Sequence, residues 1–466
     1  MKKAAFILSS LLLINFVSAQ SWKEVKAGSE FSLGLKDDGT LWSWGFNGNG
    51  QLGILTENTE EPFPVQVGND DNWRTISAGG HHVLAIKNDG TLWGWGFNGF
   101  GQVTGEDERE FYTPQQIGTD TDWKSVDACY VSSFALKNDG TLWAWGYNGN
   151  GQLGLNDFVL RSQPTQVGTA TWKIISAGGT TTMGIQDNNT LWRWGMNANY
   201  SSTDGYIIWY DTLPTQVGTD TDWGRVSVGI EFAMALKTDG SLWMYGDNTN
   251  KQLGYDTVYG NDFFQIASQY IWEQIEAGST FAFAMDDNGD VYGWGNNLYG
   301  QLGFYSKDLE PEPVLISGNL PILQISAAKG MLSTYGIYGL HTLIIREDST
   351  FCSAGANYIG QLGIGTVNND KTKKFICEEP PLSINSYNID FEEISIFPNP
   401  ARSQFTITNT ENATIELFNI LGQKIKQISS KEENTVIHTQ NLPIGIYLLK
   451  VKKGDTVIAK KVQIIE

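Results

Sequence analysis

The chain has 466 residues, a formal net charge of -20 at pH 7 and 17 tryptophans. The excess of acidic residues lies mainly between residues 20 and 391, and such a surface repels phosphate backbones and anionic membranes. The composition therefore disfavours nucleic acid as a partner, while it suits cationic partners, calcium or plain solubility. Three cysteines are too few for a disulfide scaffold.

The N-terminal segment begins with two lysines, followed by an apolar run that ends at Val17 and the small residues Ser18 and Ala19. This order is typical of a secretory signal peptide. We expect residues 1–19 to be removed by cleavage between Ala19 and Gln20, with a buried helix as the alternative. No later apolar segment is long enough to span a bilayer, so no membrane span is predicted.

Residues 20–379 repeat a unit of about fifty residues. Each unit has a Trp-led strand ending in Ala-Gly, a β-rich run, an Asp-Gly pair, and a Leu-Trp-x-Trp-Gly strand, with variations. A shared glycine marks the units at Gly45, Gly96, Gly146, Gly195, Gly246, Gly295 and Gly355. Short β-forming runs between turn signals are strands. Four strands in each of seven units predict an all-β fold, a seven-bladed β-propeller.

The repeated residues are interpreted as structural. An Asp-Gly pair such as Asp38-Gly39 suits a two-residue hairpin turn with positive φ at both positions. A calcium site is the alternative, but an EF-hand needs a longer loop with a distal glutamate. The tryptophans keep a fixed phase in the repeat, so we expect them in the core between blades rather than in a cofactor-binding box.

The two ends of the repeat array suggest how the ring closes. The first unit begins at Trp22 without a preceding Pro-x-x-Val strand, and a matching strand follows the last unit within residues 371–379. We expect this strand, around Phe375–Cys377, to complete the N-terminal blade. Cys352 and Cys377 could pair in an oxidising compartment, but the sequence favours buried free thiols.

The repeat resembles the regulator of chromosome condensation repeat over residues 21 to about 379. The Ala-Gly step, the Asp-Gly turn and Trp-Gly-x-Asn-x-x-Gly-Gln-Leu-Gly, as in Leu142–Gly154, carry the resemblance. It implies a seven-bladed propeller. It transfers no function, because the fold hosts exchange factors, photoreceptors and inhibitors alike. Exchange activity on a small GTPase does not suit an exported acidic protein.

The fifty-residue repeat pattern ends after Cys377. Residues 380–391 are predicted to be a linker, and 392–466 a small C-terminal β-sandwich. Its motifs resemble the type A C-terminal sorting domain of type IX secretion, through Pro398, Asn399, Pro400, Gly422, Gly445 and Tyr447. The resemblance implies a Bacteroidetes-type bacterium, handling by the type IX secretion machinery, passage through the periplasm, and a secreted or cell-surface location. The domain is usually cleaved off. An ordinary accessory sandwich is the alternative.

The sequence predicts no catalytic residue, metal ligand or cofactor. His81 and His82 are adjacent, so their side chains point to opposite faces of a strand, and His341 aligns with His82 in the repeat. Nucleophile-elbow, phosphate-loop and dinucleotide motifs are lacking. The acidic run Glu106–Glu108 is interpreted as a solvated loop.

Function is therefore expected in departures from the repeat, because loops on a rigid ring make binding surfaces. Longer connections occur at Thr104–Tyr112, Asn199–Tyr210, Tyr255–Tyr270 and Met331–Leu340. The candidate binding residues are the aromatic ones Tyr200, Tyr206, Trp209, Tyr210, Tyr259, Phe263, Tyr335 and Tyr338. A second candidate set follows Trp-Gly: Phe46, Phe97, Tyr147 and Met196.

The sequence thus predicts an exported, non-catalytic propeller that binds an extracellular protein. A glycan-binding surface module and a polymer-degrading enzyme that uses loop carboxylates are the alternatives.

Overall fold

The computed structural model describes residues 21–465 apart from 106–107, 202–204, 257–258, 317–320, 331, 334–335, 338–339, 368–371, 378–393, 400, 420–423, 441 and 454–455. The predicted cleavage residues Ala19 and Gln20, and the motif residues Pro400 and Gly422, lie outside the described residues. The chain divides into two compact units, one over Gln20–Pro380 and one that includes Pro381–Glu466.

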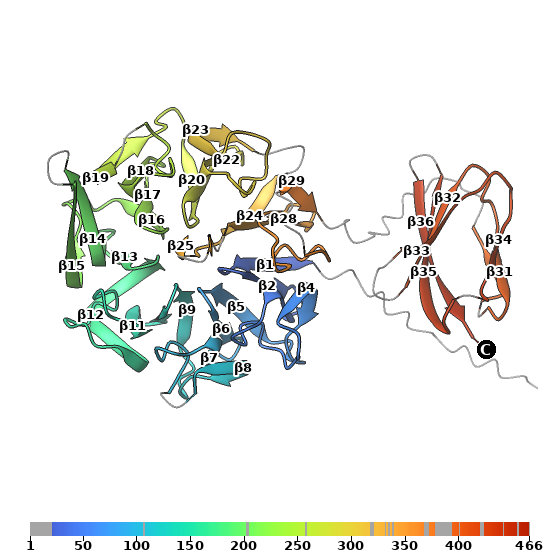
Figure 1. Ribbon diagram of the computed structural model, residues 1–466, viewed down its shortest axis with the longest axis horizontal. Helices are drawn as coiled ribbons and strands as arrows, with labels where there is room; N and C mark the ends of the chain where they lie inside the picture. Colours follow the sequence, from blue (N-terminus) through green and yellow to red (C-terminus); the bar gives the residue numbers. More distant parts are fainter. Residues whose placement is uncertain are drawn as a thin grey trace, which may run out of the picture. The chain divides into compact units, whose positions relative to one another are not determined.

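The first unit is a ring of antiparallel sheets (Figure 1). The sheet next to the N-terminus holds β1 (Trp22–Ala27), β2 (Phe31–Lys36), β3 (Leu41–Phe46) and β4 (Glu60–Gln66) in that order. The following sheet holds β5 (Trp73–Ala78), β6 (His82–Lys87), β7 (Leu92–Phe97) and β8 (Glu110–Gln116). In each sheet the first strand lies innermost and the last outermost, which confirms the all-β propeller prediction.

The next part of the chain, after β8, forms one continuous seven-stranded sheet of the ring. It holds β9 (Trp123–Ala128), β10 (Ser132–Lys137), β11 (Thr141–Gly146), β12 (Arg161–Ala177), β13 (Thr181–Gln186), β14 (Leu191–Ser201) and β15 (Gly205–Gln216) in that order. The early part of β12 pairs with β11 and its later part, from Trp172, pairs with β13. β12 is thus the outer strand of one blade and the inner strand of the next.

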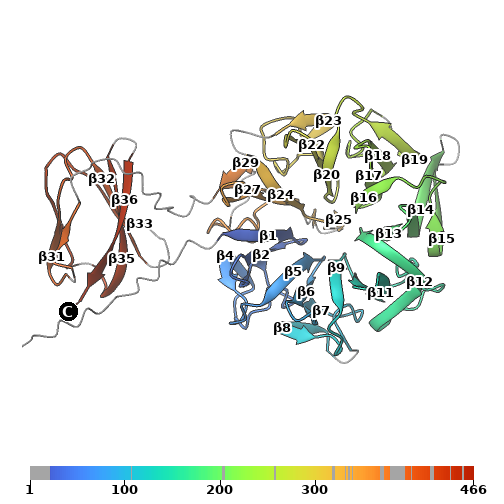
Figure 2. The same ribbon diagram turned by 180° about the vertical axis from the view of Figure 1, so that it is seen from behind.

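The remaining sheets complete the ring (Figure 2). They hold β16 (Trp223–Val228), β17 (Phe232–Lys237), β18 (Leu242–Asp247) and β19 (Tyr259–Ile266); then β20 (Trp272–Ala277), β21 (Phe281–Asp286), β22 (Val291–Asn296) and β23 (Leu309–Leu315). The last holds β24 (Ile322–Ala327), β27 (His341–Arg346), β28 (Phe351–Gly355) and β29 (Thr372–Cys377), with a small pair, β25 (Leu332–Ser333) and β26 (Gly336–Ile337), in an insertion. The count of seven blades stays a prediction from the repeats.

The predicted closure of the ring was wrong. β29 pairs with β28 of its own sheet, and β1–β4 form a complete blade without it. The reason is a phase error: the Pro-x-x-Val strand ends each blade as its outer strand instead of opening the next blade. The ends of the ring meet through side chains, since Val25 N donates to Gln324 Oε1 at 3.0 Å and Ala27 N to Ser326 Oγ at 3.0 Å.

The hairpin turns also differ from the prediction. Positive φ occurs at Gly39 but not at Asp38, and four residues join β2 to β3. Asp38 Oδ1 instead accepts hydrogen bonds from Thr40 N at 3.0 Å and Thr40 Oγ1 at 2.7 Å. The aspartate therefore caps the turn, and only the glycine needs the left-handed conformation.

The shared glycine of the repeat has no room for a side chain. Gly146 has φ 96, and a Cβ there would lie 2.7 Å from Val131 O and 2.9 Å from Ser132 Cα. The glycine thus allows the end of β11 to lie against the β9–β10 connection. This close approach is why the unit can be recognised from the sequence.

Tryptophans fill the space between blades, as predicted. Trp44, Trp95, Trp145, Trp194 and Trp294 are fully buried. Several indoles also reach the preceding blade: Trp145 Nε1 donates to Val103 O at 3.2 Å, and Trp44 Nε1 donates to Gln361 O at 3.0 Å across the ring closure. One residue type thus supplies both the packing and a hydrogen bond at the blade junctions.

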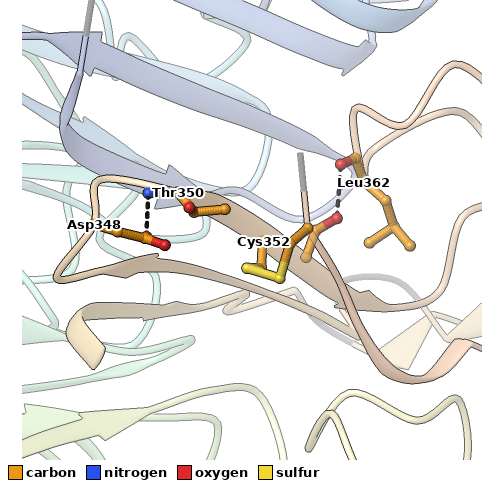
Figure 3. The surroundings of a disulfide bond; sticks show 6 residues. Asp348, Thr350, Cys352 and Leu362 are labelled. Carbon is orange, nitrogen blue, oxygen red and sulfur yellow. Dashed lines mark hydrogen bonds between the residues drawn. A yellow bond between two sulfur atoms is a disulfide. The ribbon is translucent and has the colours of Figure 1, made fainter. Parts of the chain in front are cut away.

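The thiol prediction was wrong. Cys352 and Cys377 form a disulfide that joins β28 to β29, where they are register partners (Figure 3). The sequence alone could not show that these cysteines face each other across a strand pair. Cys129 is buried and free.

The second unit is a two-sheet sandwich. One sheet has the order β30 (Ile396–Phe397), β31 (Gln404–Ile407), β34 (Thr435–His438); the other has β33 (Lys424–Ser429), β32 (Thr414–Asn419), β35 (Gly445–Lys453), β36 (Thr456–Ile464). Phe405, Leu417 and Leu449 are in its core. Two predicted motif residues hold the sandwich together: Tyr447 Oη donates to Pro443 O at 2.7 Å, and Asn399 Nδ2 donates to Lys461 O at 2.8 Å.

Candidate partner-binding face

The irregular loops lie on one face of the ring. In each blade, the connections from the first to the second strand and from the third to the fourth leave from the same sheet edge, because neighbouring strands are antiparallel. Hydrogen bonds join the two connections, as from Phe46 N to Glu30 O at 3.0 Å and from Asp247 N to Glu231 O at 2.8 Å. All four long connections found in the sequence begin at this edge, which we call the loop face.

The centre of the ring holds a polar cavity of about 380 Å³, lined by the innermost strands. In four blades a serine of the inner strand accepts a hydrogen bond from the backbone of the next blade, as Ser77 Oγ does from Ala128 N at 2.9 Å. Asp127 and Glu276 take over this role from serine, accepting from Ala177 N at 2.6 Å and from Ala327 N at 3.2 Å.

Opposite charges meet in this axial cavity, because Lys26 and Lys329 also line it. Burial raises the pKa of Asp127 and Glu276, while Lys329 and Lys26 reduce that rise. Burial lowers the pKa of Lys26, but Glu24, Glu276 and Asp127 outweigh it and raise the pKa overall. The charges are balanced within the cavity and tied to blade contacts, so we assign them to holding the ring together.

Two buried histidines also bridge blades. His82 Nε2 lies 2.9 Å from Ser133 Oγ, and His341 Nε2 lies 2.9 Å from Ser32 Oγ. Each serine donates its hydrogen to a backbone carbonyl, so the histidine must donate through Nε2. Burial lowers the pKa of both histidines to about 3, which keeps them neutral.

An exposed apolar patch lies at the outer part of the loop face, between the β11–β12 connection and β15. Its members, which we call the hairpin patch, are each 46–60% exposed: Phe158, Val159, Leu160, Ile207, Ile208, Tyr210 and Leu213. Ile208 and Tyr210 project from one side of β15 and Ile207 from the other, so the patch includes both sides of this outer strand. The rings of Phe158 and Tyr210 lie 6.2 Å apart and join the two segments. A concentration of exposed apolar side chains is typical of an interaction site.

The predicted aromatic residues have different positions. Tyr210 is exposed and belongs to the patch. Trp209 is half-buried, with the guanidinium of Arg193 over its ring at 5.5 Å. Phe263 is half-buried; it packs against Trp223 at 5.6 Å and stacks on Tyr245 at 5.5 Å within its own blade, in a core shared with the preceding blade. Of these three, only Tyr210 is exposed.

For the other predicted aromatic residues, the structure describes at most the backbone position or the burial. Tyr200 and Tyr206 are backbone partners in the β14–β15 hairpin, and Tyr259 begins β19. Tyr335 and Tyr338 lie outside the described residues. The set that follows Trp-Gly is half-buried throughout, at Phe46, Phe97, Tyr147 and Met196.

The described residues show neither a metal-binding cluster nor a membrane-spanning helix. No group of three or more histidine, cysteine, aspartate or glutamate side chains there could hold a metal ion. In the same part of the chain, no helix has the length and apolar character needed to cross a membrane.

Comparison with known families agrees with the architecture. Two models of the regulator of chromosome condensation (RCC1) repeat match residues 38–86, 139–185 and 288–331, and 22–51, 73–102, 124–152 and 272–301. A model of the secretion system C-terminal sorting domain matches residues 395–465. This chain carries RCC1 repeats followed by a type IX sorting domain. The sorting domain marks it for export, with a secreted or cell-surface location.

Individual relatives of the RCC1 repeats cover only parts of the chain. Human probable E3 ubiquitin-protein ligase HERC3 is 33% identical over 104 residues, which are 22% of this chain and 10% of that protein. The Ultraviolet-B receptor UVR8 of Arabidopsis thaliana is 32% identical over 93 residues, 20% of this chain and 21% of the receptor. The matched segments thus span a tenth to a fifth of these relatives.

Solved RCC1-type structures resemble the ring as a fold. Human WBSCR16 superposes with a TM-score of 0.60 at 19% identity, over 67% of this chain and 86% of that chain. Yeast RCC1 (Prp20), solved with Kap60, gives 0.59 at 20% identity, over 67% and 81%. Identities this low show the propeller fold alone.

Sequence reasoning missed two features of the site. The charged axial residues Lys26, Asp127 and Glu276 stand where other repeats have serine, a departure that alignment of the repeats would have shown. The apolar members Phe158–Leu160 of the patch were missed because their loop is of ordinary length. Their exposure depends on packing that the sequence does not show.

Proposed function

We propose that this exported propeller is a non-catalytic protein-binding module whose loop face captures an extracellular protein through the hairpin patch. The observation that supports this is the contact between Phe158 and Tyr210, which joins two exposed apolar segments into one surface. The strands beside it are fixed by buried blade junctions, so the surface is preorganised and loses little conformational entropy on binding. Binding energy in such interfaces is concentrated in aromatic and apolar side chains.

The two alternatives have less support. A sugar needs a free aromatic face, whereas the ring of Trp209 is covered by Arg193 on one side. For a polymer-degrading enzyme, Glu108 is the described member of the acidic run Glu106–Glu108, and it is exposed, as expected for a solvated loop. A glycan array and an activity screen on polysaccharides would separate these functions from protein binding.

Affinity capture from the extracellular medium of the source cells tests the proposal. We expect Ile207→Asp and Phe158→Asp to lose the protein that the wild type captures, because each puts a charge into an apolar interface. Leu55→Asp is the matched control: Leu55 is 82% exposed, in the β3–β4 connection, far along the chain from the patch. The proposal fails if all three variants capture the same proteins as the wild type.

A further inference from the structure

A cavity of about 240 Å³ adjoins the hairpin patch, between β13, β14 and β15 on one side and β17 and β18 on the other. Its walls are mainly apolar, formed by Met183, Met196, Ile208, Phe232 and Tyr245. Ile208 belongs to both the cavity and the patch, so the two adjoin at this residue. At about 30 Å³ for each water-sized group, the cavity holds about eight such groups.

Among the described residues that line this cavity, Glu231 is the one charged residue. Its backbone has φ 59, a left-handed conformation that costs a non-glycine residue about 1–2 kcal/mol. The matching residues Thr180 and Thr280 of neighbouring repeats do not have positive φ. Glu231 is exposed and lines the cavity, so the fold places a glutamate at the solvent side of this apolar cavity at a conformational cost, which is typical of functional sites.

The surroundings of Glu231 leave its negative charge unfavourable. Burial raises its pKa, and the charge of Asp247 raises it further. Arg193 does not line the cavity. Its guanidinium lies 5.5 Å from the ring of Trp209 and 5.1 Å from the ring of Tyr245, which is a wall of the cavity. A cation entering the cavity would relieve the repulsion between the two carboxylates.

We propose that this cavity takes a lysine or arginine side chain of the protein partner. Such a side chain combines an apolar stem with one positive charge, matching methionine and phenylalanine walls with a single carboxylate. The strongly acidic chain, with its net charge of -20, also favours a basic partner surface. The inference rests on the proposed function and names the anchor by which the partner is held.

Titration of the full chain with side-chain analogues, followed by NMR, tests this chemistry. We expect n-pentylammonium to bind in the millimolar range, as small fragments do. Its affinity should exceed that of n-pentanol and hexanoate by about tenfold, the size of a charge-assisted hydrogen bond. Glu231→Gln should remove the preference for n-pentylammonium over n-pentanol.

Glu30→Gln is the matched control. Glu30 occupies the same repeat position in the first blade, and burial raises its pKa also, but it does not line this cavity. The control variant should bind n-pentylammonium as the wild type does. If Glu231→Gln does not fold, the ranking of the three probes on the wild type still decides. Equal affinity for the three probes, or no binding at all, overturns the inference.

Capture experiments separate this inference from the proposed function. If Ile207→Asp abolishes capture while Glu231→Gln leaves it unchanged, protein binding stands and the basic anchor is wrong. If the cavity binds n-pentylammonium but neither variant affects capture, the cavity is a site for small amines and its assignment to a partner's side chain is overturned. Loss of capture in both variants, with Glu30→Gln unaffected, supports the inference.

Discussion

The blade junctions are built from residues that recur in the repeats, whereas the hairpin patch is built mainly from segments that differ between repeats. At the junctions a few positions recur: a serine or carboxylate accepts the amide of the next blade, and a buried tryptophan donates to the previous one. At the patch, two irregular segments and the outer strand β15 leave apolar side chains in solvent. The difference teaches that the repeated positions hold the ring together, whereas the recognition that we propose resides in the irregular segments.

The largest expected effect is the loss of stability when a tryptophan at a blade junction is replaced. Trp145→Ala should lower the free energy of unfolding by about 5 kcal/mol, because it empties a fully buried site and removes the hydrogen bond to Val103 O. Trp209→Ala, at a half-buried position, should cost less than about 2 kcal/mol. Urea denaturation of both variants measures the free energy of unfolding. Equal losses of stability would contradict the distinction between the blade junctions and the outer hairpin.

Acid should weaken two junctions through their histidines. Between pH 6.5 and about 3 the unfolded chain takes up protons at His82 and His341 that the folded chain cannot, so stability falls as pH falls. From pH 6.5 to 5 the two together should cost about 3 kcal/mol. The double variant His82→Asn, His341→Asn should show a shallower pH dependence in thermal melts; an unchanged slope would argue against buried neutral histidines.

The Cys352–Cys377 disulfide is expected to stabilise the last blade of the ring. Cys352→Ser with Cys377→Ser should lower the unfolding free energy by about 3 kcal/mol, as expected for a closed loop of this size, with cysteines 25 residues apart. Thermal melting with and without reductant measures the loss. Reductant should have no effect on the double variant, and a wild type insensitive to reductant would contradict the assigned role of the bond.

The smallest expected effect concerns Glu30 on the loop face. Burial raises its pKa to about 7, so the stabilising effect of its neutral form is present below its ordinary pKa and is lost as pH rises through 7. Glu30→Gln should therefore raise the melting temperature at pH 8 by about 1–2 °C and change little at pH 4.5. A variant equally stabilised at both values would show that the glutamine acts in some other way.

Much of the ring could be predicted because its determinants are local. The fixed phase of tryptophan and glycine locates the strands and the buried faces, as Trp145 and Gly146 show. The grouping of strands into blades could not be read from phase alone, since the Pro-x-x-Val strand suits either neighbour. Pairing of β29 with β28 fixed that choice and brought Cys352 opposite Cys377.

The candidate site was less predictable. Aromatic content identified the β14–β15 hairpin, and Tyr210 is indeed exposed there. Phe263 looked similar in sequence, yet it is packed in a core shared with the preceding blade. Exposure depends on the neighbouring blade, which lies about fifty residues away along the chain. The positive φ of Glu231 likewise has no signal in the sequence.

Photo-crosslinking most directly tests whether the hairpin patch is the binding surface. A benzophenone amino acid at position 207, within the patch, is compared with the same group at position 55, an exposed site in another blade. The account predicts a crosslink to one extracellular protein at position 207 and not at position 55. The same adducts at both positions, or none at 207 under conditions where the wild type captures its partner, would contradict it.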